Sequence, residues 1–443
     1  MASDWPLVRV EDFAEKIAMG PFGSNIKVET FVDSGIPVIS GAHLRGTRVE
    51  DGDFNFVTPE HAERLKNSNV LRGDVVFTHA GNIGQVAYVP ESSRYERYVI
   101  SQRQFYLRCD RSKADPAFIT YFFHSPEGQH KLLVNASQVG VPSISRPSSN
   151  LKEIEVALPP LAEQRAIAGF LGSIDDRIDN LRQTNATLEA IAQALFKSWF
   201  VDFDPVRAKS EGREPEGMDA ATAALFPCEL EDSELGPIPK GWRVGTLEDV
   251  SDLNASKWTA RKHPEIVKYI DLSGVNRNRI ETFTEFEFDA APSRARNHLR
   301  EGDTIVGTVR PGNRAYAHIH APEENLTGST GFAVLSPKKP YLSSFVYLAA
   351  TSDEAIDRLT NLADGAAYPA VRPGVVASTP CVLPSDSVLE AFAEISVPML
   401  EGIAKNNARA VAFAELSDTL LPRLISGKLC IAEPGAAAED LSS

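Results

Sequence analysis

Two polar loops in the sequence carry the residue types that read the edges of DNA bases. One runs from Thr78 to Gly84 and the other from Gly307 to Arg314, and each follows a short apolar run. Arginine pairs with guanine, and asparagine or glutamine with adenine, through two hydrogen bonds in the major groove. Lysine and arginine also bind phosphates, which position a protein without specifying a sequence. These loops are therefore candidate DNA contacts, although a solvated loop is the more ordinary explanation for any single residue.

Further candidates lie in a glycine-rich turn near residue 22, before the strand predicted at 105–107, and in basic clusters of the second half. The complete set is Ser24, Asn25, Lys27, Thr78, His79, Asn82, Gln102, Arg103, Gln104, Lys257, Arg261, Arg294, Arg296, Arg310, Asn313 and Arg314.

The sequence contains no complete enzymatic motif. Asp115 to Phe118 superficially resembles the loop by which amino-methyltransferases position an exocyclic amine, but it lacks the second proline and opens a predicted helix. An Asp N-cap followed by Pro explains it better. There is no phosphate-binding loop and no nucleophile elbow. His318 and His320 have no further ligand at metal-binding spacing. We predict neither catalytic nor metal-binding residues.

The elements that position these loops occur twice. Leu71 to Val76 is repeated as Leu299 to Ile305, Val141 to Pro147 as Tyr368 to Pro373, and Val156 to Pro159 as Cys381 to Pro384. The offset falls from about 237 to about 225 residues, so the copies match in order with small insertions and deletions. The matching segments predict one scaffold used twice, and the diverging segments between them indicate two different targets.

The two copies, 1–157 and 241–384, are predicted to be globular α+β domains. Short apolar runs separated by Gly, Pro, Asn and Asp indicate strands joined by turns. Residues 115–134 of the first copy show a helical pattern. Runs of strands followed by helices are typical of the α+β class.

A long helix is predicted after each copy, at 158–200 and 385–428. In the first, apolar residues alternate at spacings of four and three, which indicates a coiled coil rather than an ordinary core helix. The second pattern is weaker, and Pro398 should kink or restart it. Packed antiparallel, the two helices would form a strut. The predicted packing residues are Ile167, Leu171, Ile174, Ile178, Leu181, Asn185, Leu188, Leu195, Ile403, Ala410 and Ala414.

Asn185 occupies a seam position of the first helix, and Asn406 and Asn407 fall near the equivalent place in the second. One buried asparagine at such a position can fix the register of a coiled coil at some cost in stability. A solvated asparagine is the alternative.

The net charge of −15 argues against a nucleic-acid binder when taken globally. Its distribution weakens that argument, because 201–240 holds ten acidic against four basic residues whereas 240–315 holds thirteen basic against eleven acidic. Residues 201–240 are predicted to be an irregular connector with one short helix at 218–226, and 429–443 a flexible tail. Four dispersed cysteines and the lack of a long apolar run indicate a cytoplasmic protein.

Several segments together resemble the specificity subunits of type I restriction–modification systems. Leu158 to Ile167 resembles the start of their first long helix and Phe200 to Lys209 the stretch that follows it. Asp232 to Trp242 is similar to the beginning of their second recognition domain, and Leu420 to Lys428 to the end of their second helix. The resemblance spans almost the whole chain in the right order.

The resemblance implies a non-catalytic subunit that binds double-stranded DNA at a split, asymmetric site, one half per domain, with the helices setting the gap. It implies docking of two modification subunits, which use S-adenosylmethionine to methylate adenine N6. A restriction subunit that uses ATP and Mg can join them. The chain itself is expected to bind no cofactor. The alternatives are a stand-alone DNA adenine methyltransferase and an orphan DNA-binding scaffold.

Overall fold

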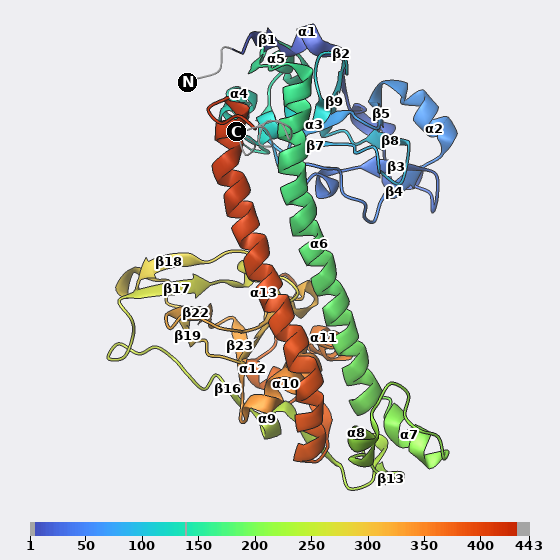
Figure 1. Ribbon diagram of the computed structural model, residues 1–443, viewed down its shortest axis with the longest axis vertical. Helices are drawn as coiled ribbons and strands as arrows, with labels where there is room; N and C mark the ends of the chain where they lie inside the picture. Colours follow the sequence, from blue (N-terminus) through green and yellow to red (C-terminus); the bar gives the residue numbers. More distant parts are fainter. Residues whose placement is uncertain (1–4, 138–139, 432–443) are drawn as a thin grey trace, which may run out of the picture. The chain divides into compact units, whose positions relative to one another are not determined.

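The computed structural model describes residues 5–137 and 140–431 (Figure 1). The chain divides into two compact units, 1–178 with 412–443 and 179–411. Most of the predicted tail, from residue 432 onward, lies outside the described residues. Over the described part, no helix combines the length and apolar character needed to cross a membrane.

Unit 1 contains two four-stranded sheets. The first has the antiparallel order β2 (Ala14–Met19), β9 (Gln104–Cys109), β6 (Val75–Thr78), β7 (Val86–Tyr88). The second has the order β4 (Asn55–Val57), β3 (Ile36–Ile39), β8 (Arg97–Ile100), β5 (Asn69–Leu71), with β3 and β8 parallel. Helices α3 (Pro116–His124) and α4 (Pro126–Leu133) replace the single helix predicted at 115–134, because Ser125 caps a new start.

The core of unit 1 follows from side-chain alternation along β6, which is buried on both faces. Val75 and Phe77 face α3 and the long helices, and Phe77 stacks on Phe105 with ring centroids 5.0 Å apart. Val76 faces the opposite way, in a separate cluster with Tyr106. The central strand therefore joins two apolar layers.

Unit 2 repeats this topology. Its first sheet has the order β16 (Ser251–Leu253), β23 (Phe332–Pro337), β20 (Thr304–Gly307), β21 (Tyr316–His318). Its second has the order β18 (Thr284–Glu287), β17 (Ile266–Ile270), β22 (Leu326–Ser329), β19 (Ala295–His298), with β17 and β22 parallel. The duplicated α+β scaffold predicted from sequence is confirmed.

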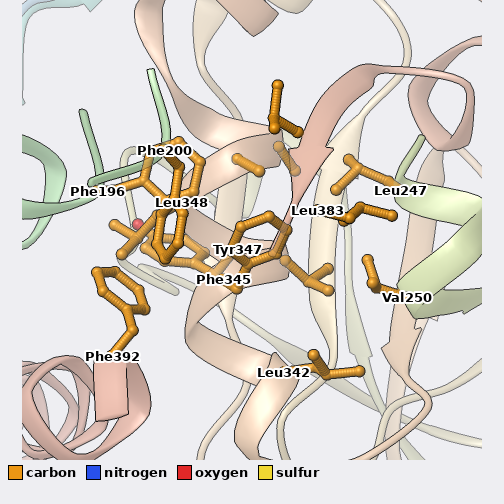
Figure 2. Close-up of a cluster of buried hydrophobic side chains, with 14 of the residues drawn as sticks. Phe196, Phe200, Leu247, Val250, Leu342, Phe345, Tyr347, Leu348, Leu383 and Phe392 are labelled. Carbon is orange, nitrogen blue, oxygen red and sulfur yellow. The ribbon is translucent and has the colours of Figure 1, made fainter. Parts of the chain in front are cut away.

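The core of unit 2 centres on α10 (Ser343–Thr351), in which every residue is buried. Figure 2 shows Phe345 and Leu348 of this helix among Phe196, Phe200 and Phe392 from the two long helices. The Phe200 ring lies 4.9 Å from that of Phe392 and 5.1 Å from that of Phe345. Aromatic side chains bury large areas, so this cluster fixes the long helices to the domain.

The matching sequence segments form the frame of each copy. The first strand of a copy pairs with its last, β1 (Leu7–Arg9) with β12 (Glu155–Ala157) and β15 (Arg243–Thr246) with β24 (Pro380–Leu383). Short helices α1 (Val10–Phe13) and α9 (Leu247–Val250) follow the first strands.

The repeated Gly-Asp turn has one geometry in both copies. Asp74 accepts a hydrogen bond from the Leu71 amide at 2.8 Å, and Asp303 accepts one from the Arg300 amide at 2.8 Å. Both carboxyl groups are buried, and burial raises the pKa of each. The preceding glycine is left-handed in both, with φ of 86° and 78°, a conformation that favours glycine.

The two long helices are α6 (Leu161–Phe200) and α13 (Asp386–Ile425), each 40 residues long. Gly427, with φ of 64°, follows the end of α13 in the left-handed conformation that commonly ends a helix. The prediction that Pro398 would restart the second helix is wrong, because α13 continues through it. Pro398 and Glu394 lie on the exposed face, so the Glu394 carbonyl that the proline leaves without a helical donor can bind water.

The seam of α13 is more regular than its apolar residues suggested. Among the buried and half-buried positions, spacings of three and four run unbroken through Leu389, Phe392, Ser396, Met399, Ile403, Asn406, Ala410, Phe413, Ser417, Leu420 and Leu424. Ala414 is exposed, so its assignment to the packing face is corrected to Phe413. The heptad repeat is not evident from the apolar residues alone, because three seam positions hold the polar residues Ser396, Asn406 and Ser417.

The connector contains regular elements, contrary to the prediction. Helix α7 (Asp204–Ser210) and a hairpin of β13 (Leu230–Ser233) and β14 (Gly236–Pro239) accompany the expected short helix, α8 (Ala220–Ala224). The reason is aromatic packing, because Phe203, Phe226 and Trp242 join Trp199 in the core of unit 2. Burial of these rings offsets the weak local propensity.

Candidate nucleic-acid interface

In unit 1, three segments far apart in sequence meet at the ends of β6 and β9. The His79 amide donates to the Arg103 carbonyl at 2.9 Å, and the Gly81 amide donates to the Pro142 carbonyl at 2.9 Å. The Ile144 amide returns a hydrogen bond to the His79 carbonyl at 2.8 Å. These bonds fix the loop after β6, the turn before β9 and the segment around 142 as one surface, which we call junction 1.

Unit 2 builds the same surface with three corresponding bonds. The Thr308 amide donates to the Gly331 carbonyl at 2.9 Å and the Arg310 amide to the Pro369 carbonyl at 2.7 Å. The Val371 amide donates to the Thr308 carbonyl at 2.9 Å. We call this surface junction 2. Its bonds align residues 308–310 with 79–81, 331 with 103, and 369–371 with 142–144.

This alignment shows that arginine and glycine exchange places between the junctions. Arg103 of junction 1 corresponds to Gly331, and Gly81 corresponds to Arg310. A Cβ on Gly81 would lie 3.2 Å from Nη1 of Arg103, so the Arg103 guanidinium lies over that glycine. Each junction thus carries one arginine at this place, supplied by a different loop.

Arg310 holds its place at a conformational cost. Its φ is 48°, in the left-handed region where the equivalent Gly81 has 85°. A non-glycine residue there costs about 1–3 kcal/mol, and such strain clusters at functional sites. Unlike Arg314, which pairs with Asp353 at 2.6 Å, Arg310 has no carboxylate partner among the residues that the structure describes.

Junction 1 collects most of the candidates of the first copy. Asn82, Gln102 and Arg103 are exposed, whereas His79 is half-buried, and burial lowers its pKa. Thr78 and Gln104 are corrected from contact residues to supporting residues, because their side chains are 2% and 1% exposed.

Junction 2 collects fewer candidates. Asn313 is exposed beside Arg310, to whose carbonyl its amide donates at 2.8 Å. The Arg294 carbonyl accepts from the Thr330 amide at 2.8 Å, which places Arg294 next to the Gly331 turn. The Arg294 side chain forms an ion pair with Asp271 at 2.8 Å.

The remaining candidate residues take no part in the hydrogen bonds that define junction 1 and junction 2. Asn25 and Lys27 are exposed in short 3-10 turns, and Ser24 falls outside the side chains that the structure describes. Lys257 is exposed beside β19, and Arg261 is exposed in the next turn. Arg296 lies over the Phe288 ring at 4.9 Å.

Most of the packing residues predicted for the two long helices are buried or partly buried. Ile167, Leu171, Ile174, Ile178, Leu181 and Ile403 are buried, whereas Leu188, Leu195 and Ala410 are partly buried. Asn185 is not solvated. Its Nδ2 donates to the Ile403 carbonyl at 3.2 Å and to Asn407 at 2.8 Å, and its Oδ1 accepts from Asn406 at 2.9 Å.

A second polar group of α6 ties the helix to the domain within unit 2. Glu189 accepts hydrogen bonds from the Tyr347 hydroxyl at 2.5 Å and from Nδ2 of Asn278 at 3.1 Å. Burial raises the pKa of Glu189 although both hydrogen bonds lower it. Asn278 also accepts from the His318 amide at 2.9 Å, so α6, α10 and β21 share one network.

Asp115 serves as a helix cap. Its Oδ1 accepts from the amides of Ala117 and Phe118 at 3.0 and 3.1 Å, with Pro116 in the first turn of α3. This geometry is the N-cap expected from sequence and leaves the methyltransferase alternative without support. Within the described residues, no group of three or more His, Cys, Asp or Glu side chains is placed to hold a metal.

The sequence analysis did not single out two exposed residues that lie beside the junctions. Tyr368 and Val141 precede the prolines that accept the junction hydrogen bonds and are 72% and 62% exposed. The sequence contained a signal, because Val141-Pro142 and Tyr368-Pro369 belong to a repeated segment. That repeat indicated only duplication until the backbone pairing placed it.

Comparison with known proteins agrees with this architecture. The profile described as "Type I restriction modification DNA specificity domain" matches residues 2–190. The chain is 23% identical to the type I restriction enzyme HindI specificity subunit of Haemophilus influenzae, covering 81% of this chain and 87% of that protein. It is 22% identical to the MjaIX specificity subunit of Methanocaldococcus jannaschii, covering 97% and 94%.

A solved structure shares the fold. The type I restriction–modification S subunit from M. genitalium superposes with a TM-score of 0.53 at 15% identity, covering 95% of this chain and 96% of that one. With the profile match, the full-length relatives and the duplicated scaffold taken together, the chain is similar over almost its whole length to the specificity subunits of type I restriction–modification systems.

Proposed function

We propose that the chain reads a bipartite, asymmetric DNA site, with junction 1 on one half and junction 2 on the other. The observation that supports this most directly is the arginine–glycine exchange. The same three backbone hydrogen bonds build both surfaces, yet the guanidinium arrives from the turn before β9 in one and from the loop after β20 in the other. One scaffold thus presents two different donor patterns, as an asymmetric target requires.

Partner subunits supply the chemistry in this proposal. Two modification subunits dock on the long helices and connector and methylate adenine N6 with S-adenosylmethionine, and a restriction subunit that uses ATP and Mg joins them. The chain itself positions DNA and carries out no catalytic step. The N-cap role of Asp115 supports this assignment, since its carboxylate is already used by the helix amides.

The long helices set the gap between the half-sites. A helix of 40 residues is about 60 Å long, which exceeds the roughly 34 Å of one DNA turn. Their heptad seam resists bending, so the number of residues along the seam would determine the gap.

Single substitutions test the reading of the half-sites. Arg103→Ala should relax or weaken recognition of one half-site, and Arg310→Ala that of the other. A bidentate contact to a base contributes about 1–3 kcal/mol, so a roughly five- to 150-fold loss in methylation at the affected half-site is expected. Methylome sequencing of cells carrying the complete system reports both half-sites separately.

Exposed arginines away from the junctions provide controls. Arg94→Ala in unit 1 and Arg243→Ala in unit 2 should leave the methylated sequence unchanged. Alteration of both half-sites by either junction variant would contradict independent reading by the two domains.

A further inference from the structure

Each junction ends in an exposed side chain followed by proline. Tyr368 in unit 2 is 72% exposed and Val141 in unit 1 is 62% exposed. An exposed residue of this size gains nothing from folding, because its apolar surface stays in water. Their occurrence at equivalent positions of two diverged copies points to a use outside the core.

The backbone holds the tyrosine tip rigidly. The Pro369 carbonyl accepts from Arg310 at 2.7 Å, and Asp364 and Ala370 exchange two backbone hydrogen bonds of 3.1 and 2.9 Å. Gly365 has φ of 115°, and a Cβ there would lie 3.0 Å from the Tyr368 carbonyl, so the turn is closed tightly. A rigid tip lowers the entropy lost when its side chain is inserted into a partner.

Arg310 links this ring to the candidate DNA surface. Its guanidinium carbon lies 4.7 Å from the centre of the Tyr368 ring, and its Nη2 donates to the Ala367 carbonyl at 2.8 Å. The same residue therefore carries a positive charge that no carboxylate of the described residues pairs, and it supports an exposed aromatic face. Cations bind the phosphates of DNA and aromatic faces stack on its bases, and this combination is typical of nucleic-acid binding.

We propose that Tyr368 is a stacking wedge that enters the base stack of the second half-site, beside the adenine that is rotated out for methylation. This inference rests on the proposed function. Removing an adenine from the stack leaves a gap, and a side chain that fills it stabilises the open state. Stacking requires no particular base, so a wedge can accompany any sequence read by the junction. Val141 fills the corresponding gap in the first half-site, where its side chain offers a smaller apolar surface than the Tyr368 ring.

Fluorescence of 2-aminopurine tests the wedge. The complete chain assembled with its modification subunits would be mixed with duplexes that carry the mapped site and 2-aminopurine at the target adenine of one half-site. Tyr368→Ala should abolish most of the fluorescence rise at the second half-site. On duplexes that carry adenine at that position, it should slow methylation of the second half-site roughly tenfold, the loss expected for one stacked base. Tyr368→Phe should retain both, and the first half-site should be unaffected.

Phe283 offers a matched control, because it is an aromatic side chain 52% exposed with Lys268 4.5 Å from its ring centre. Phe283→Ala should change neither signal. Unchanged fluorescence and methylation in Tyr368→Ala would overturn the wedge, as would an equal loss at both half-sites.

A separate measurement distinguishes failure of the wedge from failure of the proposed function. Fluorescence anisotropy of end-labelled duplex reports binding whether or not a base is rotated out. Binding of the unsubstituted complex to the mapped site together with unchanged rates in Tyr368→Ala would leave the proposed function standing without the wedge. No preference of that complex for the mapped site over an unrelated duplex would remove the proposed function itself.

Discussion

At the scale of single residues, this protein depends on polar side chains in places where apolar or flexible residues would be more stable. Arg310 occupies a left-handed position that glycine fills in the other copy. Asn185 occupies a seam position where an aliphatic side chain would pack. The Asn185 side chain is satisfied by hydrogen bonds to α13, and such a buried polar group can fix the register of a helix pair. The charge of Arg310 has no carboxylate partner among the described residues, and backbone strain of this kind clusters at functional sites.

Asn185→Ala should lower the stability of unit 2. The substitution removes the Asn185 partner of Nδ2 of Asn406 and of Oδ1 of Asn407, while Nδ2 of Asn407 keeps its bond to the Asn278 carbonyl. Unsatisfied buried groups cost about 1–3 kcal/mol each. Urea unfolding followed by tryptophan fluorescence would measure the loss, since three of the four tryptophans (Trp199, Trp242 and Trp258) lie in unit 2.

Asn180→Ala is the control for this change, because Asn180 lies on the exposed face of the same helix. A surface substitution of this kind should stay within about 0.5 kcal/mol. Equal midpoints for both variants would show that the asparagine cluster adds nothing to stability.

At the scale of elements, α13 shows how tertiary packing overrides local propensity. Pro398 lacks the amide that a helix interior requires, and three polar residues interrupt the apolar seam. The helix persists because Phe392, Leu400 and Ile403 are buried in unit 2. Most helical stability in proteins comes from such packing rather than from propensity.

Pro398→Ala should stabilise unit 2. The new amide can donate to the Glu394 carbonyl and the ring no longer crowds the preceding turn, which together contribute roughly 1–3 kcal/mol. A higher urea midpoint, again by tryptophan fluorescence, would report the gain. Val411→Ala, also on an exposed face, changes side-chain volume without adding an amide donor and should have little effect. A lower midpoint for Pro398→Ala would mean that the helix needs the proline for its path.

At the scale of the whole molecule, duplication provides two readers and the helices connect them. The strand order of both sheets is the same in the two units, whereas the junction residues differ. The net charge of −15 lies largely in the connector and tail, so it does not oppose DNA binding by the junctions. Recognition and spacing are thereby assigned to different parts of one chain.

Inserting one heptad into each long helix should lengthen the gap between half-sites without changing their sequences. The insertions belong after Ile178 in α6 and after Val411 in α13, so that the seam stays matched. Seven residues add about 10.5 Å, or up to about three base pairs. Methylome sequencing would report the gap, and an active complex with its original gap would exclude the helices as the spacer.

Seven residues inserted into the connector provide the comparison. The turn at Gly212 to Gly217 is exposed, and added side chains would meet open space at both glycines. This variant should methylate the original site with the original gap.

The sequence by itself determined the features that local patterns encode. The 4,3 spacing from Ile167 to Leu195 specified the first long helix, the paired Gly-Asp turns revealed the duplication, and Asp115-Pro116 specified a helix start. Each of these depends on residues close together in the chain, where periodicity and capping act directly.

Only the tertiary structure decided which loops meet. Residues 79–81, Arg103 and residues 142–144 are separated by dozens of residues, and no local pattern shows that the backbone of 79–81 forms hydrogen bonds with both of the other segments. The same backbone pairing shows that arginine and glycine exchange places between the junctions, and it places Tyr368 beside Arg310. Side-chain identity can suggest a DNA contact, but the position of the side chain depends on non-local strand pairing, which determines which residues each junction brings to its surface.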